Sequence, residues 1–313
     1  MAESKALRKP VNPSLARARK NYQLYLLLLA PFVWLLIFQY VPMYGVIIAF
    51  KNFNASLGIM GSEWVGLRHF ERFFRSHFFN RTVVNTVALS LYSLVAGFPV
   101  PIILALALNC SLRAKFAKTV QFVTYMPYFI STVVMVGIII EFLNPRVGIV
   151  NLIRQALGLS QIDFMAQPGL FRHIYVWSGV WQHAGWGTIV YLAALAGIDP
   201  QLHEAATCDG AGRLKRIIHI DLPGLMPTIT ILLILSLGTI ISVGFEKVFL
   251  MQNNLNLVTS EVISTFVYKV GLAAMVPNFS YGAAVGLFLS VVNFVMIALV
   301  NTVAKRLGET SLW

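Results

Sequence analysis

Charged residues are scarce in this chain of 313 residues: Asp, Glu, Lys and Arg together make up 12% of it. A soluble domain carries about twice that fraction. Hydrophobic residues make up 58%, and the mean hydropathy is +0.74. A chain of this length and composition leaves no room for a large soluble domain, so we expect much of its surface to face lipid.

Acidic residues are scarcer than basic ones, with 12 Asp and Glu against 24 Lys and Arg and a net charge of +12. In a soluble protein such an excess suggests nucleic-acid binding. Here no basic run is interleaved with aromatic residues, so nucleic acid is not an expected partner. Basic residues instead favour the cytoplasmic side of a membrane and anionic lipid head groups.

Several chemical motifs are also missing. The chain has no G-x-x-x-x-G-K-[ST] phosphate loop, no H-E-x-x-H and no G-x-S-x-G. The two cysteines, Cys110 and Cys208, lack metal-ligand spacing and fall in loops expected in the cytoplasm, so we expect free thiols and no metal site. We predict no catalytic residues and no cofactor bound by this chain, and no enzyme activity of its own.

Long apolar runs, in contrast, are plentiful. Each is long enough for a membrane-spanning helix, and in lipid the backbone must satisfy its hydrogen bonds internally. They cover about residues 22–48, 82–108, 119–143, 173–197, 225–247 and 278–303. We therefore predict an all-α, polytopic membrane bundle of six transmembrane helices.

The expected organisation is a single membrane domain. Residues 1–21 form a basic cytoplasmic segment, 22–306 the six-span domain and 307–313 a cytoplasmic tail. An even number of spans places both termini on one side. The basic loop at 109–118 assigns that side to the cytoplasm.

One polar segment, Asp199 to Pro223, interrupts the apolar pattern between the fourth and fifth spans. Pro200 can begin a helix, and Gly210 permits a tight turn. A second, amphipathic helix follows, and we expect Pro223 to end it before the fifth span. From the residues alone, the segment is either a docking surface for a partner or an ordinary loop with an interfacial helix.

The spacing within this segment resembles the EAA motif of ABC importer permeases, EAA-x3-G-x9-I-x-LP. The matching residues are Glu204, Ala205, Ala206, Gly210, Ile220, Leu222 and Pro223, and Asp209 and Ala211 fit the common DGA variant. Weaker matches run from about Leu24 to Trp313, such as Tyr125-Met126-Pro127 and Phe245-Glu246-Lys247. Together they resemble the maltose-type sugar permeases, in particular the polysaccharide and oligosaccharide branch.

The resemblance implies a cytoplasmic coupling helix that docks an ATPase subunit through the motif residues. It also implies a second, distinct permease subunit, two ATPase subunits that bind ATP and Mg²⁺, and an extracytoplasmic solute-binding protein. The chain would lie in the plasma (inner) membrane of a prokaryote. It would import an oligosaccharide by alternating access.

The substrate path is less clear from the sequence. Trp177 and Trp181 are four residues apart, so they share one helix face and could stack on sugar rings, with Gln182 and His183 beside them. The alternative is an aromatic belt at the membrane interface. Glu246 and Lys247, expected to close the fifth span, could be a substrate contact or gate, or an interfacial pair.

Two other functions stay open. One is an ABC importer permease for another polar solute, such as a monosaccharide, polyol or glycerophosphate. The other is an ion-coupled secondary carrier, which needs intramembrane carboxylates and usually repeated halves. The chain shows few such carboxylates and no repeat. A membrane-embedded enzyme or receptor has no supporting motif.

Overall fold

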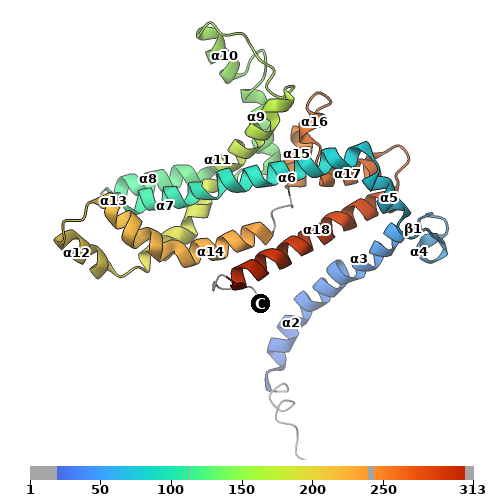
Figure 1. The fold of residues 1–313 in the computed structure, drawn as a ribbon, viewed down its shortest axis with the longest axis horizontal. Helices are drawn as coiled ribbons and strands as arrows, with labels where there is room; N and C mark the ends of the chain where they lie inside the picture. The colour runs from blue at the N-terminus through green and yellow to red at the C-terminus, as the bar shows by residue number, and fades with distance from the viewer. Residues whose placement is uncertain (1–19, 112, 239–242, 307–313) are drawn as a thin grey trace, which may run out of the picture.

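The computed structural model describes residues 20–111, 113–238 and 243–306, and these are mostly helical (Figure 1). The N-terminal part is built around one long apolar run and a hairpin. Its elements are α2 (Tyr22–Leu35), η1 (Leu36–Tyr40), α3 (Val41–Met43), η2 (Tyr44–Phe50), β1 (Lys51–Asn52), α4 (Gly58–Gly61), β2 (Glu63–Trp64), α5 (Arg68–Phe74), α6 (His77–Gly97) and α7 (Pro99–Asn109). The two short strands pair antiparallel, with Lys51 opposite Trp64.

The second part of the chain surrounds one long helix, α11. The elements that precede and include it are α8 (Ala114–Tyr125), η3 (Met126–Phe129), α9 (Thr132–Phe142), α10 (Ile149–Ala156) and α11 (Pro168–Ala196). Those that follow are α12 (Pro200–Cys208), α13 (Arg213–Arg216), η4 (Ile217–Asp221), α14 (Leu222–Gly238), α15 (Phe245–Met251), α16 (Leu257–Ser260), α17 (Ile263–Tyr268), η5 (Lys269–Ala273) and α18 (Phe279–Arg306).

Four helices of the described chain are long and apolar enough to cross a membrane. They are Tyr22–Phe50, His77–Asn109, Arg213–Gly238 and Phe279–Leu299. A bent pair, Ala114–Phe129 with Thr132–Phe142, could supply a fifth. Helix α11 has 29 residues but is not among them, because Trp, His, Gln, Ser and Gly dilute its apolar character. The structure is thus a multi-pass bundle, and the count of six stays a prediction.

The third predicted span, 119–143, was wrong as a single helix. The chain bends by 102° between η3 and α9. Pro127 lies in η3 and offers no backbone N–H, and the Ser131 side chain caps α9 by accepting the Val134 N–H at 3.4 Å. At the break, the Ile130 carbonyl accepts a hydrogen bond from Gln182 Nε2 of α11 at 2.9 Å. The bend is therefore stabilised by two side chains, Ser131 at the start of α9 and Gln182 of α11.

The predicted C-terminal boundary of the fifth span, 225–247, was also wrong. Helix α14 ends at Gly238, and Gly244, with a φ of −57° and a ψ of 103°, lies outside any helix before α15 begins at Phe245. The described residues around Lys247 therefore belong to a separate short helix.

The core is arranged around α11, which packs against α6, α7, α8 and α14. The approach to α8 is close, because a Cβ at Gly185 would overlap the Thr124 carbonyl. At the end of the bundle away from α12, Asn85 Nδ2 donates to the Glu261 carbonyl at 3.0 Å, and Arg172 donates to Asn85 Oδ1 at 2.7 Å. Asn85 thus joins three helical segments, as expected of a polar residue inside a span.

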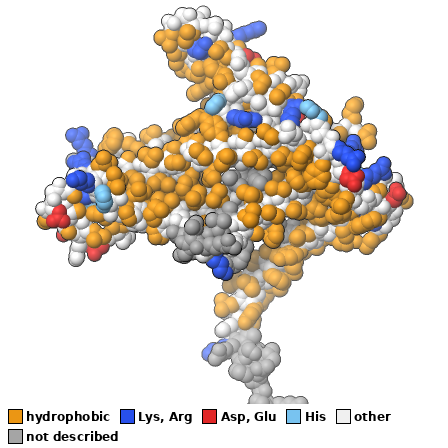
Figure 2. Space-filling model, viewed as in Figure 1, with side chains coloured by type: hydrophobic (Ala, Val, Ile, Leu, Met, Phe, Trp, Pro, Cys, Tyr) orange, Lys and Arg blue, Asp and Glu red, His pale blue; other side chains and the backbone are white. Residues whose placement is uncertain are grey.

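The surface of the molecule fits a helix bundle surrounded by lipid. Apolar side chains cover most of the visible flank, whereas charged side chains gather mainly at the end with α12 and α13 and at the opposite end near α5 (Figure 2). Helix α2 extends away from the other helices (Figure 1) and buries none of its residues.

Candidate functional site

The segment that resembles the EAA motif forms a short helix with a tight C-terminal cap. The Asp199 carboxylate accepts a backbone N–H of the first turn of α12 at 2.9 Å. At the other end, the Ala211 N–H donates to the Ala206 carbonyl at 2.8 Å, and the Gly210 N–H donates to the Thr207 carbonyl at 3.0 Å. Gly210 has a φ of 72°, in the left-handed region that favours glycine. These bonds form a Schellman motif, so the predicted turn at Gly210 is confirmed.

The motif residues divide between an exposed face and a face turned to the next helix. No residue of α12 is buried. Five motif residues are exposed: Glu204, Ala205, Asp209, Gly210 and Pro223. Three others line a cavity of about 220 Å³ against α13 and η4: Ala206, Ala211 and Ile220. The small alanines allow the two segments to approach closely, whereas Glu204 is exposed and lines a larger cavity.

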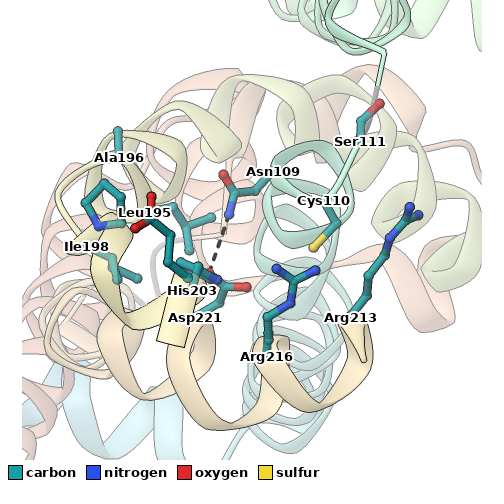
Figure 3. A pocket seen from close by; sticks show the side chains of 12 residues that line it. Asn109, Cys110, Ser111, Leu195, Ala196, Ile198, His203, Arg213, Arg216 and Asp221 are labelled. Carbon is teal, nitrogen blue, oxygen red and sulfur yellow. Dashed lines mark hydrogen bonds and ion pairs between the residues drawn. The ribbon is translucent and has the colours of Figure 1, made fainter. Parts of the chain in front are cut away.

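A larger cavity of about 540 Å³ lies between α12, the end of α7 and the start of α13 and η4 (Figure 3). At its base, Asp221 is buried, with 2% of its surface exposed. Its Oδ1 lies 3.3 Å from His203 Nε2 and accepts a hydrogen bond from Asn109 Nδ2 at 3.5 Å. One carboxylate therefore ties α12 and α7 to the beginning of α14.

Basic residues also line this cavity (Figure 3). Arg213 and Arg216 project from α13, and Arg216 donates to the Thr207 hydroxyl of α12 at 3.0 Å. Cys110 lines the same cavity. Burial raises the pKa of its thiol, the Asp221 carboxylate raises it further, and the two guanidinium groups oppose the shift. Both cysteines are free thiols, as expected.

The prediction that Pro223 ends the amphipathic helix was wrong. Residues Arg213–Gly238 form one continuous helix of 26 residues. Leu222 begins the α-helical part and Pro223 lies in its first turn, directly after the π-helix η4. The wider π turn relieves the clash between a proline ring and the carbonyl four residues earlier. The same arrangement occurs at Pro42, which follows the π-helix η1.

The predicted aromatic pair lies on one face of α11, in apolar surroundings. Trp177 and Trp181 are each 53% exposed and line a cavity of about 360 Å³ with apolar side chains of α9 and α10. The indole of Trp177 donates to the Tyr92 hydroxyl at 2.9 Å, which also bonds His173 Nδ1 at 2.8 Å. Tyr92 and His173, the polar groups bonded beside Trp177, are bonded to each other, and the role of the Trp pair stays a prediction.

The other predicted residues of α11 face different surroundings. Gln182 is buried and holds the α9 break, which is a structural role. His183 is exposed, and its Nδ1 lies 2.9 Å from the Gly179 carbonyl. His183 lines a third cavity, on the side of α11 opposite Trp177 and Trp181. The structure therefore does not bring the four residues together on one surface.

This third cavity has a volume of about 500 Å³ and is lined by α6, α7, α11, α14 and α15. Lys247 of α15 faces it and is 8% exposed. Its Nζ donates to the Tyr175 carbonyl at 2.9 Å and lies 4.8 Å from the centre of the Tyr175 ring. Glu246, in contrast, is exposed. Glu246 and Lys247 are adjacent in the sequence but lie in different surroundings, so they do not form an interfacial pair.

Sequence reasoning missed Asp221, His203 and Asn109, which hold the motif segment against the bundle. Asp221 occupies the variable position of the motif between Ile220 and Leu222, so the resemblance gave it no role. A signal was available, since a lone carboxylate at the start of an apolar span is costly unless it has a partner. The partners themselves could not be read from the sequence, because Asn109 lies 112 residues away.

Known proteins resemble this chain over nearly its whole length. A family model described as binding-protein-dependent transport system inner membrane component matches residues 97–309. The polygalacturonan/rhamnogalacturonan transport system permease protein YteP of Bacillus subtilis (strain 168) is 42% identical over 290 residues, which cover 93% of this chain and 90% of YteP.

Solved structures agree with these relatives. One chain in the crystal structure of a bacterial ABC transporter involved in the import of the acidic polysaccharide alginate superposes with a TM-score of 0.87 at 39% identity, covering 94% of this chain and 99% of that one. A chain of the bacterial alginate ABC transporter in complex with an alginate pentasaccharide-bound periplasmic protein gives the same TM-score and identity, with 95% and 99% coverage.

Proposed function

Because the chain belongs to the binding-protein-dependent transport system inner membrane components, as a permease of the sugar and polysaccharide ABC transporters, we propose that it moves an oligosaccharide into the cytoplasm by ATP-driven alternating access. In this proposal α12 is the surface on which a separate ATPase subunit docks. The observation that carries it is the geometry of α12: a capped, exposed helix joined by a buried carboxylate to a helix long enough to span the membrane.

Docking on α12 follows from its exposed face. Glu204 offers a carboxylate for an Arg or Lys of the partner, and Ala205 allows the partner backbone to approach closely. The Schellman cap fixes the end of the helix, so Gly210 and Ala211 turn the chain directly into α13. A docked ATPase that changes shape then displaces α12 together with the segments tied to Asp221.

The substrate class follows from relatives that match almost end to end. YteP is a polygalacturonan/rhamnogalacturonan permease, and the alginate transporter takes up an acidic polysaccharide with a periplasmic protein that binds a pentasaccharide. We propose the same kind of assembly here: a second permease subunit, two ATPase subunits that bind ATP and Mg²⁺, and an extracytoplasmic binding protein. A monosaccharide, polyol or glycerophosphate is the alternative cargo.

We further propose that α11 and the bent pair also cross the membrane, which gives six spans with both termini in the cytoplasm. Helix α11 is long enough, and it is covered by α6, α7, α8 and α14, so its polar side chains need not face lipid. The basic residues of α13 then lie on the cytoplasmic side with α12.

The test is ATP hydrolysis stimulated by the loaded binding protein, measured on the purified complex in proteoliposomes. Glu204→Ala removes the partner contact, and Gly210→Pro removes the left-handed turn, since proline fixes φ near −65°. We expect both variants to insert into the membrane and to lose ATPase recruitment or stimulation. Glu63→Ala, an exposed glutamate of β2, is the matched control and should behave as wild type.

Two results would contradict the proposal. One is normal stimulation in both variants, and the other is a wild-type chain that recruits no ATPase subunit. Loading the binding protein in turn with oligosaccharides, monosaccharides and glycerophosphate distinguishes the cargo classes, because only the transported class should stimulate hydrolysis.

A further inference from the structure

The cavity between α11, α14 and α15 holds a buried positive charge without a negative partner. The Lys247 side chain is more than nine-tenths buried and faces the cavity. Of the described residues that line this cavity, Lys247 alone is a Lys, Arg, Asp or Glu. The ion pairs found in the described chain join Glu261 to Arg81 and Lys269, and Asp221 to His203, so none involves Lys247.

The hydrogen-bonding capacity of the Lys247 ammonium is only partly used within the described chain. It carries three N–H donors, and one of them bonds the Tyr175 carbonyl. The ring of the same tyrosine adds a cation–π contact at 4.8 Å. A buried charge is costly unless it is paired, and neither a carbonyl nor a ring neutralises it. The remaining donors can therefore bind an anion that enters the cavity.

Helix α11 leaves room for this group. A Cβ on Gly179 would lie 3.2 Å from Lys247 Nζ, so a glycine at this position lets the ammonium rest against the helix backbone. His183, one turn further along the same face, also lines the cavity and offers a ring nitrogen for hydrogen bonding. A volume of about 500 Å³ is within the range of small-ligand sites.

We propose that Lys247 binds the carboxylate of a uronic acid unit as the oligosaccharide passes through this cavity. The inference rests on the proposed import function and names the residue that selects an acidic sugar. A single lysine provides one compact charge, which matches a carboxylate monoanion, whereas phosphate sites usually gather several donors, often from arginine. Lys247 is thus a specificity residue for charge, and the ring of Tyr175 lies against its ammonium.

The experiment measures equilibrium binding to the complete, detergent-purified transporter in the absence of the binding protein. The probes are tetragalacturonate, its methyl ester, in which methyl groups remove the carboxylate charges, and glycerol phosphate as a phosphate anion. For wild type we expect tetragalacturonate to bind at least tenfold more tightly than the ester. Lys247→Met should remove this difference and leave ester binding unchanged, and Lys247→Arg should retain part of it.

Two further variants separate a binding role from a structural one. Lys51→Met makes the same change at a lysine that bonds the Ile59 carbonyl outside the cavity, and it should bind both probes as wild type does. Gly179→Ala keeps the charge but displaces the ammonium, so it should weaken tetragalacturonate binding severalfold without affecting the ester. This variant tests the inference even if Lys247→Met does not assemble.

The inference is overturned if wild type does not prefer the acid, if Lys247→Met weakens both probes equally, or if glycerol phosphate binds more tightly than tetragalacturonate. Failure of the underlying import function is recognised separately, because it would abolish the stimulation of wild-type ATP hydrolysis by the loaded binding protein. A transporter that couples normally but shows no preference for charge contradicts only the role of Lys247.

Discussion

Removing the Asp221 carboxylate should uncouple α12 from the membrane helices without unfolding the chain. In Asp221→Ala, the end of α7 and the middle of α12 lose their common acceptor. The contact with His203 Nε2 at 3.3 Å is the stronger one, since the bond from Asn109 at 3.5 Å is at the limit of hydrogen bonding. A hydrogen bond to a charged group contributes about 2 kcal/mol.

That energy sets the size of the expected effect. A loss of about 2 kcal/mol changes the ratio of attached to detached α12 about 30-fold. If motion reaches the spans through this contact, binding-protein-stimulated hydrolysis should fall by a similar factor, whereas basal hydrolysis should change little. His203→Ala should have nearly the same effect, and Asn109→Ala a smaller one.

A double-mutant cycle in proteoliposomes measures whether the two residues act as a unit. Two residues that work only through each other give a double variant no worse than the worse single variant. We therefore expect His203→Ala/Asp221→Ala to match Asp221→Ala in the number of ATP molecules hydrolysed per sugar imported. The role of this contact would be refuted if the losses of the two single variants added up in the double variant, or if Asp221→Ala coupled as wild type does.

Other predictions follow from local geometry. Gly210→Ala places a Cβ in the left-handed region at a cost of about 1 kcal/mol and should lower stimulated hydrolysis. Gly210→Asn should lower it less, because asparagine tolerates this conformation. Equal losses in the two variants would contradict the backbone explanation. Maleimide at neutral pH should label exposed Cys208 faster than Cys110, because the raised pKa of Cys110 leaves less thiolate. A docked ATPase subunit should protect Cys208 from labelling. Unchanged labelling of Cys208 in the complex would place the docking surface elsewhere. Gly185→Ala forces a Cβ against the Thr124 carbonyl and should lower the free energy of unfolding by about 1–3 kcal/mol. Gly169→Ala in the same helix has open space around the new Cβ and should be nearly neutral. Similar melting temperatures for the two variants would refute the close packing at Gly185.

Local chemistry explains what could be predicted from the sequence. The helix after Pro200 and the turn at Gly210 depend on residues within a few positions of each other, so their pattern can be read directly. The resemblance to the EAA motif adds the fixed spacing, and the Schellman bonds give a physical reason for small residues at Ala206 and Ala211. The long apolar helices were predicted for the same reason, because length and hydropathy are properties of a single segment.

Contacts between distant segments explain the rest. The break before α9 depends on Gln182, 52 residues further along the chain, which was expected near the substrate path. Lys247 is buried because it reaches Tyr175, 72 residues earlier, whereas the adjacent Glu246 is exposed. A proline was expected to end a helix at position 223, but the π turn before it depends on backbone adjustments that no single residue indicates.

The unbroken helix from Arg213 to Gly238 has a consequence for the amplitude of motion. Its 26 residues measure about 39 Å, so a tilt of about 5° around one end displaces the other end by about 3 Å. Leu232 and Ser236, near its far end, form part of the wall of the Lys247 cavity. A small tilt of this helix at α12 can therefore change the width of that cavity by about 3 Å.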